Sequence, residues 1–398
     1  MPTATVLPNS TTAIPAPLDL PKNFEEYDES RRKSFMRVHD FKQAGGRLVG
    51  TLCSYAPAEV IEAAGAACVG LCGTSNAPIP AAETVLPKNL CPLSKSTYGF
   101  AFTDQCPYTY FSDVIVGETT CDGKKKMYEL LGDIRPTYVL HLPNGQLRDH
   151  EKQGWYEEVV ALKQRLEELF GVTITDDDLR QAVHNRNVYR QALLDLFELQ
   201  RADPCPMTSV EFMTTLQSGT FAMDVVAQAE KIEQLVATRR QEAAEGKAAV
   251  RAGAKRIVLS GCPAGCLINK VGKTIDQNGG VIVCLDSCMG ERTNSMMVDE
   301  DAPDILRAIS DRYLQINCSV MTPNPGRVEN TLAMVEKYHA DGVVDAVLQA
   351  CHTFNLESVN MGRTLEDRGI PYMKLETDYS DGDLGQVSTR LSAFIEMI

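Results

Sequence analysis

The sequence predicts an α/β protein built from two similar halves, each with a parallel β-sheet. Three observations support this fold class. Short apolar runs of strand length alternate with longer segments of helical length, as expected when helices connect parallel strands. The alternation occurs twice, before and after a long helical region. Most of the apolar runs in both halves end at or beside a cysteine.

The first half follows an N-terminal segment, 1–23, whose Pro, Thr and Ala content predicts a flexible arm. A helix is expected over about 24–44. The expected strands are 47–53, 66–72, 113–121 and 136–143. The expected helices between them are 57–65, 91–104 and 123–132. These elements define a first α/β domain over 24–150.

A helical linker or cap region is expected over 151–253. Its segments have apolar residues at helical spacing, and Thr175 followed by acidic residues is typical of a helix start. The second α/β domain, 254–398, repeats the pattern of the first. Its expected strands are 255–262, 281–288, 343–351 and 371–379, and its expected helices are 264–280, 301–316, 355–368 and 383–398.

The chain has 13 cysteines, an odd number in a chain of 398 residues, which argues against a disulfide framework. Cysteines end corresponding strands of the two halves: Cys53 and Cys262, Cys72 and Cys288, and Cys121 and Cys351. Open α/β sheets build their sites at the carboxyl ends of parallel strands. Cys68 and Cys284 lie within strands instead, so we expect both to be core residues.

The placement of the strand-end cysteines favours metal or iron–sulfur ligation over a core role. Cys91, Cys121 and Cys351 each precede an expected helix, whose N-terminus favours a thiolate. The run Lys124–Lys126 either offsets the charge of an anionic cluster or is a solvated face. Zinc ligation and a single reactive cysteine remain weaker alternatives.

Several common motifs are missing. C-x2-C spacing does not occur, and C-x3-C pairs such as Cys262/Cys266 and Cys284/Cys288 are isolated, which argues against a ferredoxin-like domain and a zinc finger. VGKTI at 271–275 lacks the first glycine of a P-loop, so any ATP that the reaction needs is expected to bind elsewhere. His352 is either a proton donor or a structural residue.

Composition excludes other classes of function. The net charge of −14 and the lack of a basic stripe argue against nucleic-acid binding. No run of 18 apolar residues predicts a membrane span, and the N-terminus lacks the features of a secretory signal. We therefore expect a cytoplasmic protein.

Five motifs resemble the 2-hydroxyacyl-CoA dehydratase family, which includes benzoyl-CoA reductase subunits. They are SYAPAEVIEAAGA, LPKNLCPLSKSTYGF, VGETTCDGKKKMYELL, LQACHTFNLES and LETDYSDGDLGQVSTRLSAFIE. The resemblance runs from about residue 24 to the C-terminus and is strongest to the branch of double-cubane cluster proteins. It implies two Rossmann-like (flavodoxin-like) domains with an iron–sulfur cluster between them. A separate dimeric ATPase activator, with its own [4Fe–4S] cluster, would supply electrons.

The resemblance also implies the ligands. Three cysteines hold one [4Fe–4S] cluster in the family, and they match Cys91, Cys121 and Cys351. The double-cubane branch implies a homodimer with an [8Fe–9S] cluster in each chain, which needs about three further thiolates. We expect these to be Cys53, Cys288 and Cys318, with Cys72 having nearly the same claim as Cys288. Cys106 and Cys262 are weaker candidates, and no catalytic residue is assigned.

Three functional hypotheses follow. The first is an anaerobic, ATP-dependent reductase of small molecules with a double-cubane cluster. The second is an (R)-2-hydroxyacyl-CoA dehydratase subunit with one [4Fe–4S] cluster. The third is a non-catalytic electron carrier. The sequence does not define the substrate.

Overall fold

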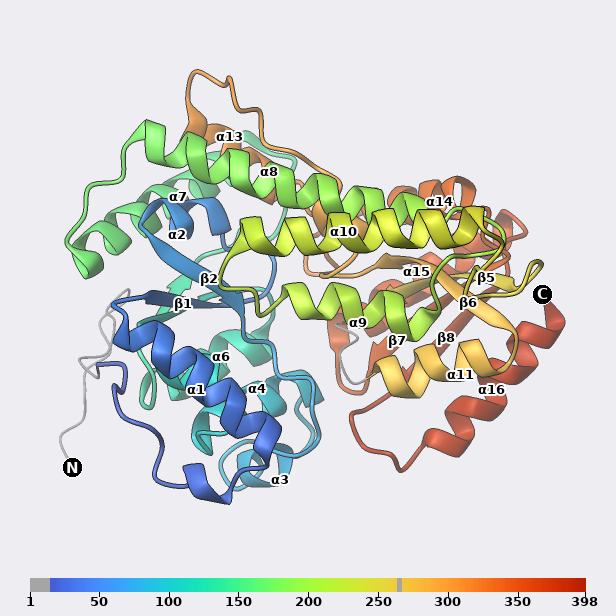
Figure 1. Ribbon diagram of the computed structural model, residues 1–398, viewed down its shortest axis with the longest axis horizontal. Helices are drawn as coiled ribbons and strands as arrows, with labels where there is room; N and C mark the ends of the chain where they lie inside the picture. The colour runs from blue at the N-terminus through green and yellow to red at the C-terminus, as the bar shows by residue number, and fades with distance from the viewer. Residues whose placement is uncertain (1–14, 263–266) are drawn as a thin grey trace. The chain divides into compact units, whose positions relative to one another are not determined.

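The predicted α/β class with two parallel sheets is confirmed (Figure 1). The computed structural model describes residues 15–262 and 267–398. These residues form two units. Unit 1 contains the described residues 15–183, 221–223 and 299–314. Unit 2 contains the described residues 184–220, 224–262, 267–298 and 315–398.

Unit 1 has a four-stranded parallel sheet with the strand order β2-β1-β3-β4. The strands are β1 (Arg47–Leu52), β2 (Ala66–Gly70), β3 (Val114–Glu118) and β4 (Thr137–Leu140). Every residue of β3 is buried, as expected for a parallel strand whose sheet is covered on both faces. This is why the strand appears in the sequence as a continuous apolar run rather than as an alternating pattern.

Helices cover the sheet of unit 1. They are η1 (Phe24–Glu26), α1 (Glu29–Gln43), α2 (Ala58–Ala63), α3 (Ile79–Ala82), α4 (Pro92–Phe102), α5 (Pro107–Phe111), α6 (Asp122–Gly132), α7 (Asp149–Phe170) and α13 (Ile305–Leu314). Helix α2 contacts β2 and α7, whereas α5 contacts β1 and α1. The rings of Phe35 and Phe111 meet edge to face in this core, with their centroids 6.1 Å apart.

Unit 2 repeats the sheet topology of unit 1, with the order β6-β5-β7-β8. Its strands are β5 (Lys255–Gly261), β6 (Gly280–Asp286), β7 (Gly342–Leu348) and β8 (Tyr372–Thr377). In both sheets the first strand of the unit lies between the second and the third. The repeat that the sequence predicts is therefore present at the level of topology.

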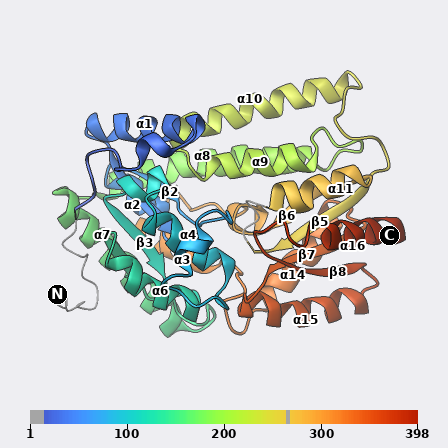
Figure 2. The ribbon, with the colours of Figure 1, turned by 90° about the horizontal axis from the view of Figure 1, so that it is seen from below.

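Helices lie on both faces of the second sheet. They are the π-helical turn η2 (Ile268–Gly272), α11 (Lys273–Gln277), α12 (Glu291–Asn294), α14 (Pro325–Lys337), α15 (His352–Asp367) and α16 (Leu384–Met397). Figure 2 shows α11 and α16 on one side of β5–β8 and α14 and α15 on the other. Such two-sided cover leaves the carboxyl ends of the strands as the edge where side chains can form a site.

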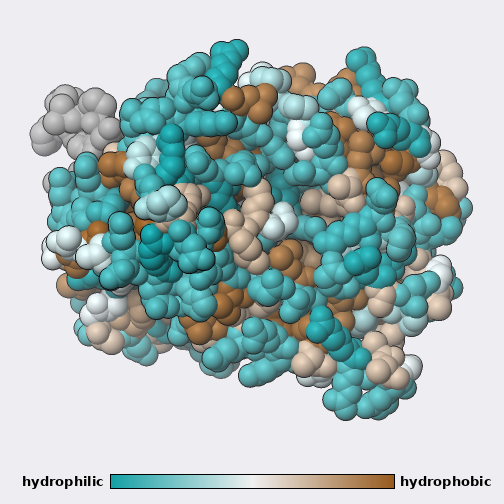
Figure 3. All heavy atoms as spheres, turned by 90° about the horizontal axis from the view of Figure 1, so that it is seen from above, coloured by the Kyte–Doolittle hydropathy of each residue, from teal (hydrophilic) through white to brown (hydrophobic). Residues whose placement is uncertain are grey.

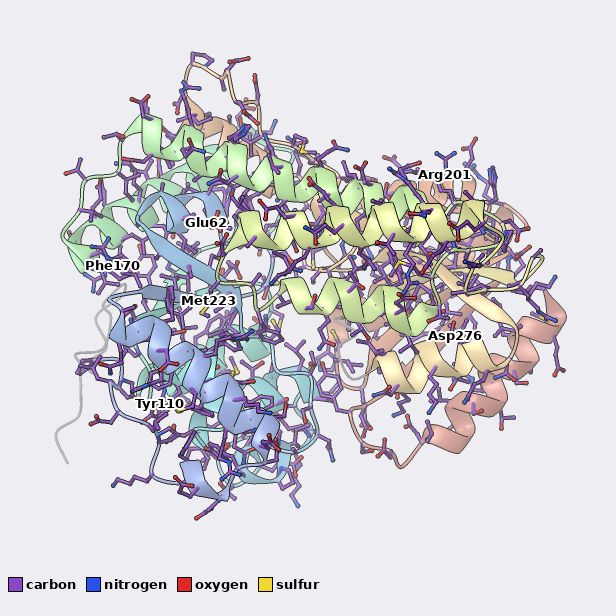
Figure 4. All side chains as sticks on the ribbon, in the orientation of Figure 1. Glu62, Tyr110, Phe170, Arg201, Met223 and Asp276 are labelled. Carbon is purple, nitrogen blue, oxygen red and sulfur yellow. The ribbon has the colours of Figure 1, made fainter. Side chains whose placement is uncertain are left out.

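The predicted helical region is divided between the units. Its helices are α7, α8 (Asp176–Leu199), α9 (Ser209–Gly219) and α10 (Val225–Ala244). Helix α8 begins in unit 1 and ends in unit 2, to which α9 and α10 belong. Asp276 of α11 accepts hydrogen bonds from the backbone N–H groups of Ser209 and Val210, at 2.9 and 3.1 Å (Figure 4). The carboxylate thereby satisfies N–H groups at the start of α9.

Several helices differ from the prediction. The short helices α3, α5 and α12 lie in no predicted helix, and the described part of the helix expected over 264–280 is η2 followed by α11. The helix expected over 24–44 is a short 3-10 turn followed by α1, because Asp28 accepts a hydrogen bond from the backbone N–H of Arg31 (2.9 Å) and caps a new helix. Helix α14 is missing from the prediction. Asn324-Pro325 was a usable signal for it, since proline is common at the first position of a helix.

The described residues contain no helix that is both long enough and apolar enough to span a membrane. Figure 3 shows one face of the molecule, on which hydrophilic side chains predominate and hydrophobic atoms form separate patches.

Candidate functional site

Three predicted ligands occupy the same structural position, the residue directly before a helix. Cys91, Cys121 and Cys351 are the N-cap residues of α4, α6 and α15. Their carbonyl oxygens accept the first intrahelical hydrogen bonds at 3.1, 3.0 and 2.9 Å. In none of the three does the thiol accept the capping hydrogen bond. The partial positive charge of each helix N-terminus favours a thiolate there.

The strand-end cysteines of the two units correspond in position. Cys53 and Cys262 directly follow β1 and β5, Cys72 and Cys288 come two residues after β2 and β6, and Cys121 and Cys351 come three residues after β3 and β7. Because the strands of each sheet are parallel, the thiols of each unit are carried by loops at one edge of its sheet.

In unit 1, the loops around Cys72, Cys91 and Cys121 lie against one another. A Cβ atom on Gly73 would lie 2.5 Å from the backbone of Ser96 in α4, so glycine allows the loop after Cys72 to contact this helix. The hydroxyl of Thr97 also accepts a hydrogen bond from the N–H of Gly73 (2.9 Å). Helices α4 and α6 are in contact. The local fold therefore brings these three loops together.

Cys53 has an unusual backbone conformation. Its φ is 105°, in the left-handed region that favours glycine, and Ala350, directly before Cys351, has a φ of 58°. Surrounding contacts must hold such residues in place, and they concentrate at functional sites. A carboxyl oxygen of Glu118 accepts a hydrogen bond from the backbone N–H of Ala56 and so holds the loop after Cys53.

The lysine run after Cys121 divides into one buried and two exposed side chains. Lys124 is 6% exposed, and its Nζ lies 3.7 Å from the Sγ of Cys72. Burial by itself lowers the pKa of Lys124, but nearby ionisable groups, above all Cys72, raise it well above its ordinary value. Lys125 and Lys126 instead pair with acidic residues of their own helix. Lys124 therefore fits a role in offsetting negative charge, whereas Lys125 and Lys126 fit the alternative of a solvated helix face.

Glu118 makes the stability of the protein depend on pH. Burial raises the pKa of Glu118 to about 8, although Lys124 and backbone N–H groups oppose the shift. Between about pH 4.5 and 8 the folded state therefore holds a proton that the unfolded state releases, so stability falls as pH rises through this range. We expect Glu118→Gln to reduce this pH-dependent loss of stability, which is on the order of a few kcal/mol in the free energy of unfolding.

The measurement is the thermal unfolding midpoint between pH 5 and 8. Glu129→Gln, at an exposed position of α6, is the matched control and should follow the wild type. If the unfolding midpoints of Glu118→Gln and the wild type depend on pH in the same way, the carboxyl of Glu118 does not titrate between pH 5 and 8.

Unit 2 places two guanidinium groups beside its thiols. The Nη2 of Arg292 lies 3.9 Å from the Sγ of Cys288, and its Nη1 donates to the carboxylate of Asp286 at 3.1 Å. The Nε of Arg327 lies 3.4 Å from the second oxygen of this carboxylate. All three charged side chains are fully buried. Burial raises the pKa of the Cys318 thiol, and the charge of Arg292 opposes this effect.

Two hydroxyl groups connect Cys351 to Ser319, the residue directly after Cys318. The Sγ of Cys351 lies 3.8 Å from the Oγ1 of Thr353, to which Ser319 donates a hydrogen bond at 3.1 Å. The electrostatic effect of Cys288 on Cys318 shows that these two thiols are also neighbours. Unit 2 thus brings three predicted ligands into one region.

The remaining cysteines have other environments. Cys284 is fully buried in β6, which confirms its predicted core position, whereas Cys68 in β2 is half-buried. Cys262 is buried, and its Sγ accepts a hydrogen bond from the backbone of β7 (3.5 Å). Cys266, and with it the pair Cys262/Cys266, lies outside the described residues. Within 15–262 and 267–398 no cysteine is joined in a disulfide.

The predicted ligands come from both units: Cys53, Cys91 and Cys121 from unit 1, and Cys288, Cys318 and Cys351 from unit 2. Among the described residues, no three His, Cys, Asp or Glu side chains are grouped so that they could hold a single metal ion. In an iron–sulfur cluster each thiolate binds a different iron atom, so its ligands surround the cluster instead of converging on one point. An all-thiol donor set with buried cations behind it fits an anionic cluster of this kind.

Sequence reasoning missed the buried charges around the thiols. Arg292, Arg327 and Asp286 were not predicted as part of the site, and neither was Glu118. A usable signal was present for Glu118, because a carboxyl inside an apolar strand run is rarely buried without a specific reason.

The chain belongs to the family of the 2-hydroxyglutaryl-CoA dehydratase D-component. Residues 53–398 match the family model described as "2-hydroxyglutaryl-CoA dehydratase, D-component". The family comprises 2-hydroxyacyl-CoA dehydratases and benzoyl-CoA reductases, and its members typically contain iron–sulfur clusters. The family resemblance noted in the sequence is therefore confirmed.

Individual relatives match nearly the whole chain. It is 43% identical over 382 residues to the "Putative dehydratase subunit YjiM" of Escherichia coli (strain K12), covering 96% of this chain and 99% of that protein. It is 23% identical to the (R)-2-hydroxyglutaryl-CoA dehydratase, subunit beta, of Acidaminococcus fermentans, covering 94% and 98% of the two chains. It is 21% identical to a benzoyl-CoA reductase subunit of Thauera aromatica, covering 92% and 94%. The names of these relatives describe subunits of larger enzymes.

Proposed function

We propose that this chain is an anaerobic reductase that binds a double-cubane [8Fe–9S] cluster and reduces a small molecule at low potential. A dimeric ATPase activator with a [4Fe–4S] cluster supplies the electrons, and the reductase works as a homodimer in the cytoplasm. Because the described residues form no P-loop of their own, ATP hydrolysis is assigned to the activator.

The observation that carries the proposal is the number of thiols at the carboxyl edges of the two sheets. One cubane would take Cys91, Cys121 and Cys351, the N-cap residues of α4, α6 and α15. That would leave strand-end thiols in both units without a role. A second cubane bridged to the first would take Cys53, Cys288 and Cys318, and Cys72 remains the alternative to Cys288. The strained backbone of Cys53 supports its choice, whereas a buried cation lies beside both Cys288 and Cys72 and does not distinguish them.

The residues of the chain would act mainly by holding anionic sulfur. When bound, the cluster would supply electrons at low potential. The N-termini of α4, α6 and α15 stabilise thiolates at Cys91, Cys121 and Cys351. The hydroxyls of Thr353 and Ser319 link Cys351 to the residue after Cys318 and so help to fix this part of unit 2. His352 is exposed, and we assign no proton transfer to it.

A subunit of an (R)-2-hydroxyacyl-CoA dehydratase with one [4Fe–4S] cluster is the second candidate. The specific observation in its favour is that relatives covering nearly the whole chain are named as dehydratase subunits. In this case the chain would need a different partner subunit, and the thiols of the second set would not bind iron.

Iron content distinguishes the two candidates. We expect anaerobically purified protein to contain about eight iron atoms per chain, because two cubanes hold twice the iron of one. About four iron atoms per chain, together with dehydration of an acyl-CoA in the presence of activator, would contradict the proposal and favour the dehydratase. Electron uptake from the activator with no reduction of any small molecule would instead favour a non-catalytic electron carrier.

A further inference from the structure

We infer that Lys124 in unit 1 and Arg292 in unit 2 are positioning residues whose buried positive charges raise the reduction potential of the bound iron–sulfur group. The inference rests on the proposed function, since it requires a cluster at the strand-end thiols. It concerns two residues that supply no ligand of their own.

Lys124 has few acceptors for a buried ammonium. An ammonium carries three donors, and among the described residues its hydrogen-bond acceptor is the Sγ of Cys72, at 3.7 Å. Glu118 is also near, but burial raises its pKa to about 8, so this carboxyl is mostly protonated at neutral pH. The ammonium therefore depends on negative charge at the thiols of Cys72 and Cys53, both of which act on it electrostatically.

Arg292 has the corresponding place in unit 2. Cys288 follows β6 at the same offset at which Cys72 follows β2, and the Nη2 of Arg292 lies 3.9 Å from its sulfur. Arg292 is fully buried, and it shares the carboxylate of Asp286 with Arg327. Arg327 also lies beside Asp345 and Glu357, whereas Arg292 pairs with Asp286 and extends its Nη2 toward the thiol of Cys288.

The two cations reach their thiols from different elements. Lys124 is on α6, which follows the third strand of its sheet, whereas Arg292 is on α12, which follows the second. The repeated topology therefore does not by itself explain why both units have a cation beside this thiol. Each unit has a buried cation beside the thiol at the end of its second strand.

A buried cation acts on reduction because the reduced group carries one more negative charge than the oxidised group. In a low-dielectric surrounding this interaction is screened much less than at the surface. Removing either cation makes the added electron less favourable and lowers the potential.

The test is a redox titration, followed by electron paramagnetic resonance, of iron-loaded Lys124→Met and Arg292→Met. At a fixed applied potential we expect the ratio of reduced to oxidised cluster to fall at least tenfold in each variant. For a one-electron couple this corresponds to a midpoint about 59 mV lower. Lys125→Met is the matched control, because it removes the same charge from an exposed position on the same helix. Its midpoint should stay at the wild-type value, since solvent and salt screen exposed charges.

Charge-conserving variants separate electrostatics from packing. Lys124→Arg and Arg292→Lys should keep midpoints near the wild-type value. Methionine variants with full iron and an unchanged midpoint would overturn the inference. If a methionine variant loses iron, the redox titration is repeated on Lys124→Gln or Arg292→Gln. A wild-type midpoint potential in the glutamine variant would equally overturn the inference. A wild-type protein without iron would instead refute the proposed function.

Discussion

Cys121→Ala and Cys351→Ala are each expected to lose most of the iron of the anaerobically purified protein. Each cysteine is the N-cap of a helix, three residues beyond the end of the third strand of its sheet. No side chain other than cysteine could supply a thiolate at either position. Losing one of three thiolates exposes an iron atom of the cubane to exchange, and removal of a metal ligand generally weakens binding strongly.

The measurement is iron per chain together with the visible absorbance of the cluster. Cys68→Ala is the control, because Cys68 lies inside β2 and not at its carboxyl end. It should keep wild-type iron content. Wild-type absorbance in Cys121→Ala or Cys351→Ala would exclude the substituted cysteine as a ligand.

Asp286→Ala is expected to destabilise unit 2 severely. Burial tends to raise the pKa of Asp286, but Arg292 and Arg327 outweigh it and hold the pKa below its ordinary value. The carboxylate also accepts hydrogen bonds from Ser260 (2.9 Å) and Thr331 (3.2 Å). Without it, two guanidiniums remain buried beside each other. Breaking a buried ion pair from one side costs about 3–5 kcal/mol, or on the order of 10 °C in the unfolding midpoint.

The thermal unfolding midpoint tests this expectation. Glu245→Ala removes an exposed acidic residue of unit 2 and should leave the midpoint unchanged. Since the folded-state pKa of Asp286 is depressed, its stabilising effect is present above about pH 4 and is lost as pH falls below that value. A small effect of Asp286→Ala near neutral pH would show that the guanidiniums find other partners. Adding Arg292→Met to Asp286→Ala should cost less than the sum of the single effects, because it removes one uncompensated charge.

The fold class was accessible from the sequence because parallel strands buried on both faces form uninterrupted apolar runs. The runs ending at Cys53, Cys121 and Cys262 all became strands of the two sheets. Helix boundaries were less accessible, since they depend on single capping groups. Asp28 starts α1 five residues later than the predicted helix start, and Asn324-Pro325 starts a helix that periodicity alone did not indicate.

For the candidate site, the cysteines could be predicted and the charges around them could not. Strand-end positions follow from topology, which repeats in the sequence. Arg327 is buried only because carboxylates from β6, β7 and α15 surround it, and these come together only in the folded chain. Lys124 is an intermediate case. It recurs at helical spacing with Met127, Tyr128 and Leu131 on the buried face of α6, so its burial could have been inferred.

The left-handed conformation of Cys53 bears on any attempt to stabilise this protein by design. Glycine would occupy a φ of 105° with little strain, whereas a side chain there costs about 1–3 kcal/mol. A substitution chosen for thermostability alone would therefore replace Cys53 with glycine and remove a proposed iron ligand. At this position the best residue for folding and the best residue for function differ, and a more heat-resistant variant would be expected to lose iron.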